Sequence, residues 1–389
     1  GFHPEATKTP STFFTVKPQL IMKNVLHFVF GLGNAGADAG LSSNKRKGFI
    51  NRKAIVLMVF ACMASFSLNA LTRYSVATGD WNNNATWSAT SGGAPGASFP
   101  IAGDDVIIEG GWTVTVVVNA ACASLTINGA TSLLYSDDPV SITVSGNVTG
   151  DGEINSMAPA NGLTILFTGN WTFSGTGPNF PANRISITAN GTSNQTLDGS
   201  LSYKTIVINK SSGTLFITGS PTTNLLTMTA GDVEYSGGTQ TVIGGVPFPS
   251  SLTLSGSGAK TMTGVTTIGN HFNMSGSATA TTGITTIGGN ISITGTAVMT
   301  NAGDNDVAGS LTVGNGATLN LDGFILTIGG TTSISGTVNT VASGAGLKRF
   351  SNMVTINSGG VWDLSGQNPA TNFRNGITMN GATFNNGSG

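Results

Sequence analysis

Apolar and small polar residues alternate along most of the chain after residue 71, and this period of two predicts β-strands with one buried face. In the last third the alternation takes the form of a triplet of an apolar, a small polar and an apolar residue. The triplets begin at residues 272, 291, 311, 332, 354 and 377, so their spacing grows from 19 to 23 residues in steps of one. Such a repeat is typical of a solenoid, in which no turn buries its apolar face alone.

Two β architectures fit short strands punctuated by turns. Asn-Gly pairs, as at 128–129 and 315–316, favour two-residue hairpins and an antiparallel sandwich or barrel. Hairpins give no reason for one triplet to recur, whereas a parallel β-helix does, because equivalent positions of successive coils stack about 4.8 Å apart. We therefore predict an all-β parallel β-helix with about three short strands per coil. Its inward ladder would be Met274, Ile293, Val313, Ile334, Ile356 and Met379.

The growing spacing predicts one turn that lengthens while the strands stay fixed. Upstream, the same alternation predicts strands at 142–144, 163–167, 185–187, 206–208, 225–228 and 252–254. Residues 151–389 are therefore assigned to β-helix repeats, and the last of them, at 377, leads us to expect a truncated C-terminus.

The N-terminal part has a different pattern. A basic stretch (residues 45–53), an apolar core (54–64) and small residues together predict a secretory signal peptide over 45–70. The apolar core is shorter than the roughly 20 residues that span a bilayer. Residues 1–44 precede this signal, and we expect them to be a non-native or disordered leader. The expected location is secreted or on the outer cell surface, with no membrane span in the mature chain.

Residues 71–150 hold three of the five Trp residues and are expected to form a capping segment. The first coil of a solenoid exposes an unpaired edge and an open core, which the large rings of Trp81 and Trp87 would plug. The alternative is that these two rings form a platform on which sugars stack, which would make them ligand-binding residues.

Charge excludes some functions. Only 8% of residues are charged, against about 25% in an average soluble domain. Eight of the 16 basic residues but only two of the 17 acidic ones precede residue 71, so the remainder carries a net charge of −7. This gives no basic surface for nucleic acid. A hydrophobic fraction of 39% and period-two alternation argue against disorder.

Candidate chemistry is sparse. His271 is the one histidine after residue 70, which excludes multi-His metal sites there, and no catalytic residue is assigned. The acidic pairs, among them Asp104-Asp105, are not spaced at one coil. Asp304 and Asp306, in a Gly turn, form the best candidate for a metal site, and Ca²⁺ is the cofactor they would bind. Cys122 is expected to be a buried small hydrophobic residue rather than a nucleophile.

Two parts of the sequence resemble known protein families. The Trp-x5-Trp pattern of 81–87 and the Pro-x2-Gly-Asp-Asp-Val-Ile-Ile pattern of 100–108 resemble the first segment of large secreted β-helical proteins and the extracellular domain named for its eight glycines. Segments 191–199 and 203–213 are similar to repeats in long surface proteins of Bacteroidota, often exported by the type IX route. The resemblance implies a non-enzymatic structural or adhesive protein whose partner is a glycan or a host or matrix surface. The alternative is a β-helix that binds or degrades polysaccharide.

Overall fold

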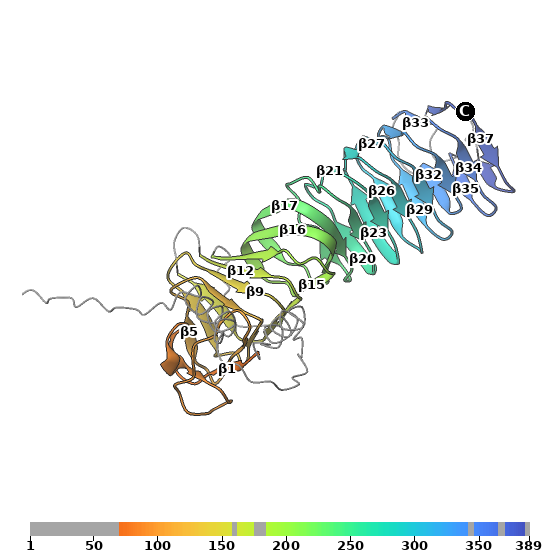
Figure 1. Cartoon of the computed structure of the whole chain (residues 1–389). Coiled ribbons are helices and arrows are strands. Elements are labelled where there is room, and N and C mark those ends of the chain that lie inside the picture. The colour runs from red at the N-terminus through yellow and green to blue at the C-terminus, as the bar shows by residue number, and fades with distance from the viewer. Residues whose placement is uncertain (1–69, 158–161, 175–183, 341–345, 365–369, 386–389) are drawn as a thin grey trace, which may run out of the picture. The chain divides into compact units, whose positions relative to one another are not determined.

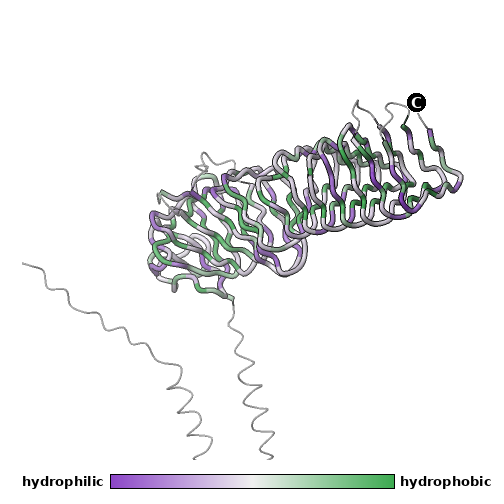
Figure 2. Tube along the Cα trace, turned by 90° about the horizontal axis from the view of Figure 1, so that it is seen from above, coloured by the Kyte–Doolittle hydropathy of each residue, from purple (hydrophilic) through white to green (hydrophobic). Residues whose placement is uncertain are grey.

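The computed structural model describes residues 70–157, 162–174, 184–340, 346–364 and 370–385. The predicted leader and all but the last residue of the predicted signal peptide lie outside these residues. The described chain is all-β and forms a parallel β-solenoid of about 13 turns, which confirms the predicted fold. The turns follow one another as stacked coils (Figure 1), and hydrophobic stretches recur from turn to turn (Figure 2). One 3₁₀ helix, η1 (Asn84–Thr86), interrupts the strands.

One sheet, called sheet A, runs through all the turns, and a second column of strands joins it. The main column is β1 (Thr72–Ser75), β4 (Asp105–Ile108), β7 (Ser124–Ile127), β10 (Val148–Gly150), β13 (Trp171–Phe173), β15 (Gln195–Asp198), β16 (Ser202–Ile217), β17 (Thr222–Tyr235), β19 (Leu252–Leu254), β22 (Phe272–Met274), β25 (Ile291–Ile293), β28 (Leu311–Val313), β31 (Thr332–Ile334), β34 (Val354–Ile356) and β37 (Ile377–Met379). The second column is β6 (Ala120–Cys122), β9 (Ser141–Val144), β12 (Leu163–Phe167) and β14 (Ile185–Ala189).

Three smaller sheets complete the coils. Sheet B is β2 (Gly79–Asp80), β5 (Thr113–Thr115), β8 (Leu133–Ser136) and β11 (Glu153–Ser156). Sheet C is β18 (Gln240–Thr241), β20 (Ser257–Thr261), β23 (Ser277–Thr282), β26 (Val298–Asn301), β29 (Thr318–Leu321), β32 (Thr337–Thr340), β35 (Val361–Asp363) and β38 (Thr383–Asn385). Sheet D is β21 (Thr267–Ile268), β24 (Thr286–Ile287), β27 (Asn305–Val307), β30 (Leu326–Ile328), β33 (Lys348–Phe350) and β36 (Thr371–Phe373).

The predicted triplets are strands of sheet A, and they pair in parallel with their equivalent positions in register. Their inward side chains form the predicted ladder: Met274, Ile293, Val313, Ile334 and Ile356 are at most 1% exposed. Met379 is 46% exposed because no described strand pairs with the other edge of β37. Register is strongly fixed here, since a slip of one residue would turn every inward side chain to solvent.

The turn that lengthens lies between sheets C and D. From Thr279 to Ile287 the chain advances 8 residues, and from Thr337 to Phe350, at equivalent positions three turns later, it advances 13. The link from sheet D back to sheet A stays at 4 residues, as from Phe350 to Val354. Most of the predicted growth therefore lies at one corner, called here the C/D corner. The last step, from 22 to 23 residues, comes instead from the link between sheets A and C, which goes from 3 residues (Ile334 to Thr337) to 5 (Ile356 to Val361).

The longer turns enclose a wider interior, and aromatic rings fill it. The inward positions of sheet C change from Ala280 to Trp362 as the turns lengthen, and those of sheet D change from Ile287 to Phe350. The rings of Phe350 and Trp362 lie 5.2 Å apart, and that of Phe373 lies within 5.5 Å of both. Such contacts keep the packing dense where aliphatic side chains would leave voids.

Two long strands mark a change of cross-section in the middle of the stack (Figure 1). β16 continues both columns of sheet A at once, because its first part pairs with β14 and its last part with β15. β17 pairs with β16 from Thr222 to Tyr235, with a register shift between the two parts. Among the described strands, none of sheet B or C falls between β11 and β18 in the chain.

Candidate functional site

Trp81 and Trp87 lie inside the first turn. They are 2% and 0% exposed, their rings meet edge to face at 5.4 Å, and Trp87 Nε1 donates to the Trp81 carbonyl oxygen at 2.7 Å. Next to them β3 (Trp87–Ser88) pairs antiparallel with β1, whereas every other ladder between described strands is parallel. The two rings therefore offer no exposed face to a sugar. They fill the core beside a strand that covers the free edge of β1.

Asp304 and Asp306 lie at the C/D corner and both face solvent, because they flank the inward-facing Asn305. Asp304 Oδ1 accepts a hydrogen bond from the backbone N–H of Ile325, one turn later, at 2.8 Å. Asp306 lies in β27 between Thr286 and Thr327 of the adjacent strands. Within the described ranges no three His, Cys, Asp or Glu side chains gather closely enough to hold a metal ion.

Other acidic residues also bind the backbone of a neighbouring turn. Asp151 accepts from the N–H of Gly129 at 2.6 Å, and Asp232 from that of Ser251 at 2.9 Å. His271 also binds the next turn: its Nδ1 accepts a hydrogen bond from the backbone N–H of Asn290 at 2.9 Å. This histidine therefore has a structural role in joining two turns. These side chains satisfy backbone groups at the corners, where the strand ladders stop.

The structure also buries lysines, which the sequence did not predict. Lys260 is 1% exposed, and its Nζ donates to the carbonyl oxygens of Gly237 and Gly238 and to Gln240 Oε1 at 2.6–2.7 Å. Gln240 Nε2 in turn donates to the carbonyls of Ile217 and Gly219 in the turn before. This Gln–Lys pair therefore joins three turns. Burial lowers the pKa of Lys260 to about 8.

An equivalent pair lies earlier in the stack. Lys210 Nζ donates to the carbonyls of Gly191 and Ser193 and to Gln195 Oε1 at 2.7–2.8 Å. Burial lowers the pKa of this lysine too. Each ammonium donates to three oxygens of the preceding turn, which satisfies its three N–H donors.

The outer face of sheet C is regular. Two columns of small side chains run along it in register, Thr279, Val298, Thr318, Thr337 and Val361 in one and Thr281, Thr300, Asn320, Asn339 and Asp363 in the other. The second column is linked by hydrogen bonds from Asn320 to Thr300 and from Asn339 to Asn320. Strand pairing places its members about 4.8 Å apart.

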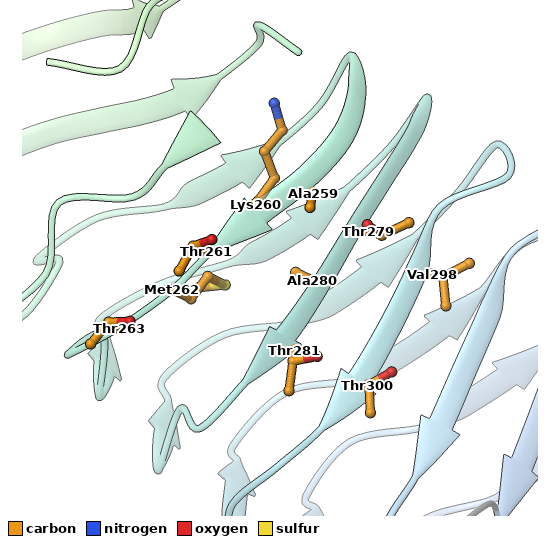
Figure 3. Close-up of a pocket in the computed structure, with 10 residues that line it drawn as sticks. All are labelled: Ala259, Lys260, Thr261, Met262, Thr263, Thr279, Ala280, Thr281, Val298 and Thr300. Carbon is orange, nitrogen blue, oxygen red and sulfur yellow. The ribbon is translucent and has the colours of Figure 1, made fainter. Parts of the chain in front are cut away.

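A shallow hollow of about 350 Å³ lies at the start of this face, on β20, β23 and β26 (Figure 3). It is lined by hydroxyl and methyl groups of outward threonines, with Met262 and Ala280 behind them. The sequence pattern missed this face because the link from sheet A to sheet C is not constant: Val313 to Thr318 spans 5 residues and Ile334 to Thr337 only 3. When the sequence is aligned on the sheet A triplets, equivalent residues of sheet C therefore fall at different positions, and their columns are not recognised.

Cys122 is buried in β6, at 1% exposed. Burial first, and then the charges of Asp105 and Asp104, raise the pKa of its thiol to about 12. We therefore expect no reaction with Ellman's reagent in the folded protein at pH 8 and full reaction in guanidinium. The full chain also holds Cys62, so the assay uses Cys62→Ser as background and Cys62→Ser/Cys122→Ser as blank. Rapid labelling of folded Cys62→Ser at Cys122 would contradict the prediction.

Among the described residues no helix is long and apolar enough to cross a bilayer. No protein-family model matches the chain, and no curated protein and no solved structure shows significant similarity to it.

Proposed function

We propose that the chain is a non-enzymatic structural and adhesive solenoid, secreted or held at the outer cell surface, whose partner is a glycan or a matrix surface. The observation that carries the proposal is the stack itself. Strands pair in parallel from β4 to β37, and acidic side chains bind backbone N–H groups of neighbouring turns. Such a stack resists distortion along its whole length and presents the same outer face repeatedly, which suits a spacer that binds by many weak contacts.

The resemblance of the repeats to Bacteroidota surface proteins supports the same proposal, as does the predicted signal peptide. We assign the adhesive contact to the outer face of sheet C. Its hydroxyl and amide groups recur at a fixed spacing, and its hollow is open to solvent. Hydroxyl and amide groups are the hydrogen-bonding groups that a neutral polysaccharide matches.

The test compares two pairs of charge substitutions. Thr281→Glu/Thr300→Glu places two carboxylates on adjacent strands of sheet C, and Ser292→Glu/Thr312→Glu does so on sheet A. We expect the first pair to weaken co-sedimentation with insoluble polysaccharides about tenfold, because carboxylates there must be desolvated on contact. The second pair should leave binding unchanged. Equal loss in both variants, or no binding by the wild-type chain to any of cellulose, chitin or a glycan array, would contradict the adhesive assignment.

Location and chemistry are tested separately. The full chain should reach the cell surface and be cleaved by protease added to intact cells, and Val56→Arg/Leu57→Arg, which breaks the apolar core of the predicted signal peptide, should retain it inside.

Release of reducing ends or unsaturated sugars from a polysaccharide panel would show an enzyme and overturn the non-enzymatic part of the proposal.

A further inference from the structure

Three neighbouring residues at the C/D corner bury polar atoms that have no hydrogen-bond partner within the protein. These atoms are Thr282 Oγ1, both side-chain amide atoms of Asn301, and Asn305 Oδ1. The three residues are 0%, 1% and 2% exposed. A buried polar group without a partner lowers the folding equilibrium constant about tenfold or more, so four such atoms in one place require an explanation.

The register brings the three residues together. Thr282 and Asn301 are direct neighbours in the ladder of β23 and β26. Asn305 lies four residues beyond Asn301, on the other side of the corner, and its Nδ2 donates to the carbonyl of Ile284, two residues beyond Thr282. The unpaired atoms therefore belong to one corner of two adjacent turns, directly behind the outward-facing Asp304.

The chemistry of these atoms selects the ligand. A cation binds oxygen acceptors, but Asn301 Nδ2 carries hydrogens that need an acceptor, and a cation would leave it unpaired. The next turn of the same corner also holds a positive charge, because Lys348 Nζ donates to the carbonyls of Asp322 and Phe324. A ligand that both donates and accepts suits the whole set, and water is the smallest one.

We propose that the C/D corner binds internal water, which bridges Thr282, Asn301 and Asn305 and is a structural part of these turns. Thr332 provides a natural contrast. Its Oγ1 is also buried and unpaired, at 1% exposed, but its ladder neighbours in sheet A are Leu311 and Val354. It has no polar neighbour in the ladder with which to share a water molecule, so the two threonines differ in surroundings and not in burial.

The first test is one substitution made at both places, in the full chain. Thr332→Val removes an unpaired hydroxyl, and amide hydrogen exchange of β31 should slow several-fold or stay unchanged. Thr282→Val removes a partner of the bridging water, and exchange of β23 and β26 should accelerate about tenfold. Slower exchange in both variants would show that Thr282 is as unsatisfied as Thr332 and would overturn the proposal.

The second test detects the water directly. Oxygen-17 relaxation dispersion of the wild-type chain should detect water held longer than the protein tumbles, and Thr282→Val should reduce that signal. No long-lived water in the wild type would overturn the proposal. So would a rise in thermal midpoint with added Ca²⁺ that EDTA reverses and Thr282→Val abolishes, because the site would then hold a cation.

Discussion

Lys260→Met is expected to destabilise the turns from β18 to β20 by about 3 kcal/mol, because it leaves the carbonyl oxygens of Gly237 and Gly238 without this donor and Gln240 Oε1 with the N–H of Gly237 alone. Methionine fits the space, since Met299 occupies the same inward column two turns later. The measurement is amide hydrogen exchange of β18 and β20, which reports local stability in a solenoid better than global unfolding does. Lys204→Met, at a half-buried lysine of β16, is the control and should cost less than about 1 kcal/mol.

The same variant predicts a pH dependence. Burial lowers the pKa of Lys260 to about 8 in the folded protein, against about 10.4 in an unfolded chain. Below pH 8 the lysine is charged in both the folded and the unfolded chain, so the free energy of folding includes the full penalty of burying the ammonium. As the pH rises from about 8 to about 10.4 the folded state loses the proton first, so the wild-type free energy of unfolding should rise relative to that of Lys260→Met. A constant difference across this range would show that the lysine stays charged when folded.

Asp104→Ala is expected to destabilise the first turns by about 3–5 kcal/mol. Asp104 is 3% exposed, lies 3.8 Å from the Nε of the buried Arg73, and accepts from the N–H groups of Leu71 and Ile101. Its removal leaves a buried guanidinium without its counter-charge. Unfolding of this part can be followed by the fluorescence of Trp81 and Trp87, which lie in the same turn.

The adjacent carboxylate is the matched control. Asp105 is half-buried and accepts from the Ser124 hydroxyl, so Asp105→Ala should cost only about 1 kcal/mol. In Arg73→Met/Asp104→Ala the uncompensated charge is gone, and the loss should be smaller than for Asp104→Ala alone. Equal losses in Asp104→Ala and Asp105→Ala would contradict the role assigned to the ion pair.

The sheet A strands could be predicted from sequence because their inward positions are almost all large and apolar. The predicted triplet starting at 291 is β25, and that starting at 354 is β34, without a shift at either end. Sheet C was less visible because its inward column includes Lys260 and Ala280, which a hydrophobic pattern does not mark. The period of two still places Lys260 on the same face as Met262, but lysine is so rarely buried that this signal is easily dismissed.

The candidate sites were harder to predict because burial and side-chain direction, and not residue type, decide their roles. Whether Trp81 plugs the core or faces solvent depends on where the first turn closes, which the local pattern does not fix. For Asp304 the turn was predicted, but the outward direction of its side chain follows from the inward position of Asn305. The unpaired amide of Asn301 is visible only after the strands have been placed in register.

The spacing between successive sheet A strands grows by one residue per coil, so no coil between β22 and β37 has the same perimeter as its neighbours. Deletion of one coil by recombination would set a ring against a ring two residues longer; loss of the coil that holds Ile328, for example, would place Phe350 over Val307. These repeats are therefore not interchangeable units, and their order along the gene is itself a structural requirement.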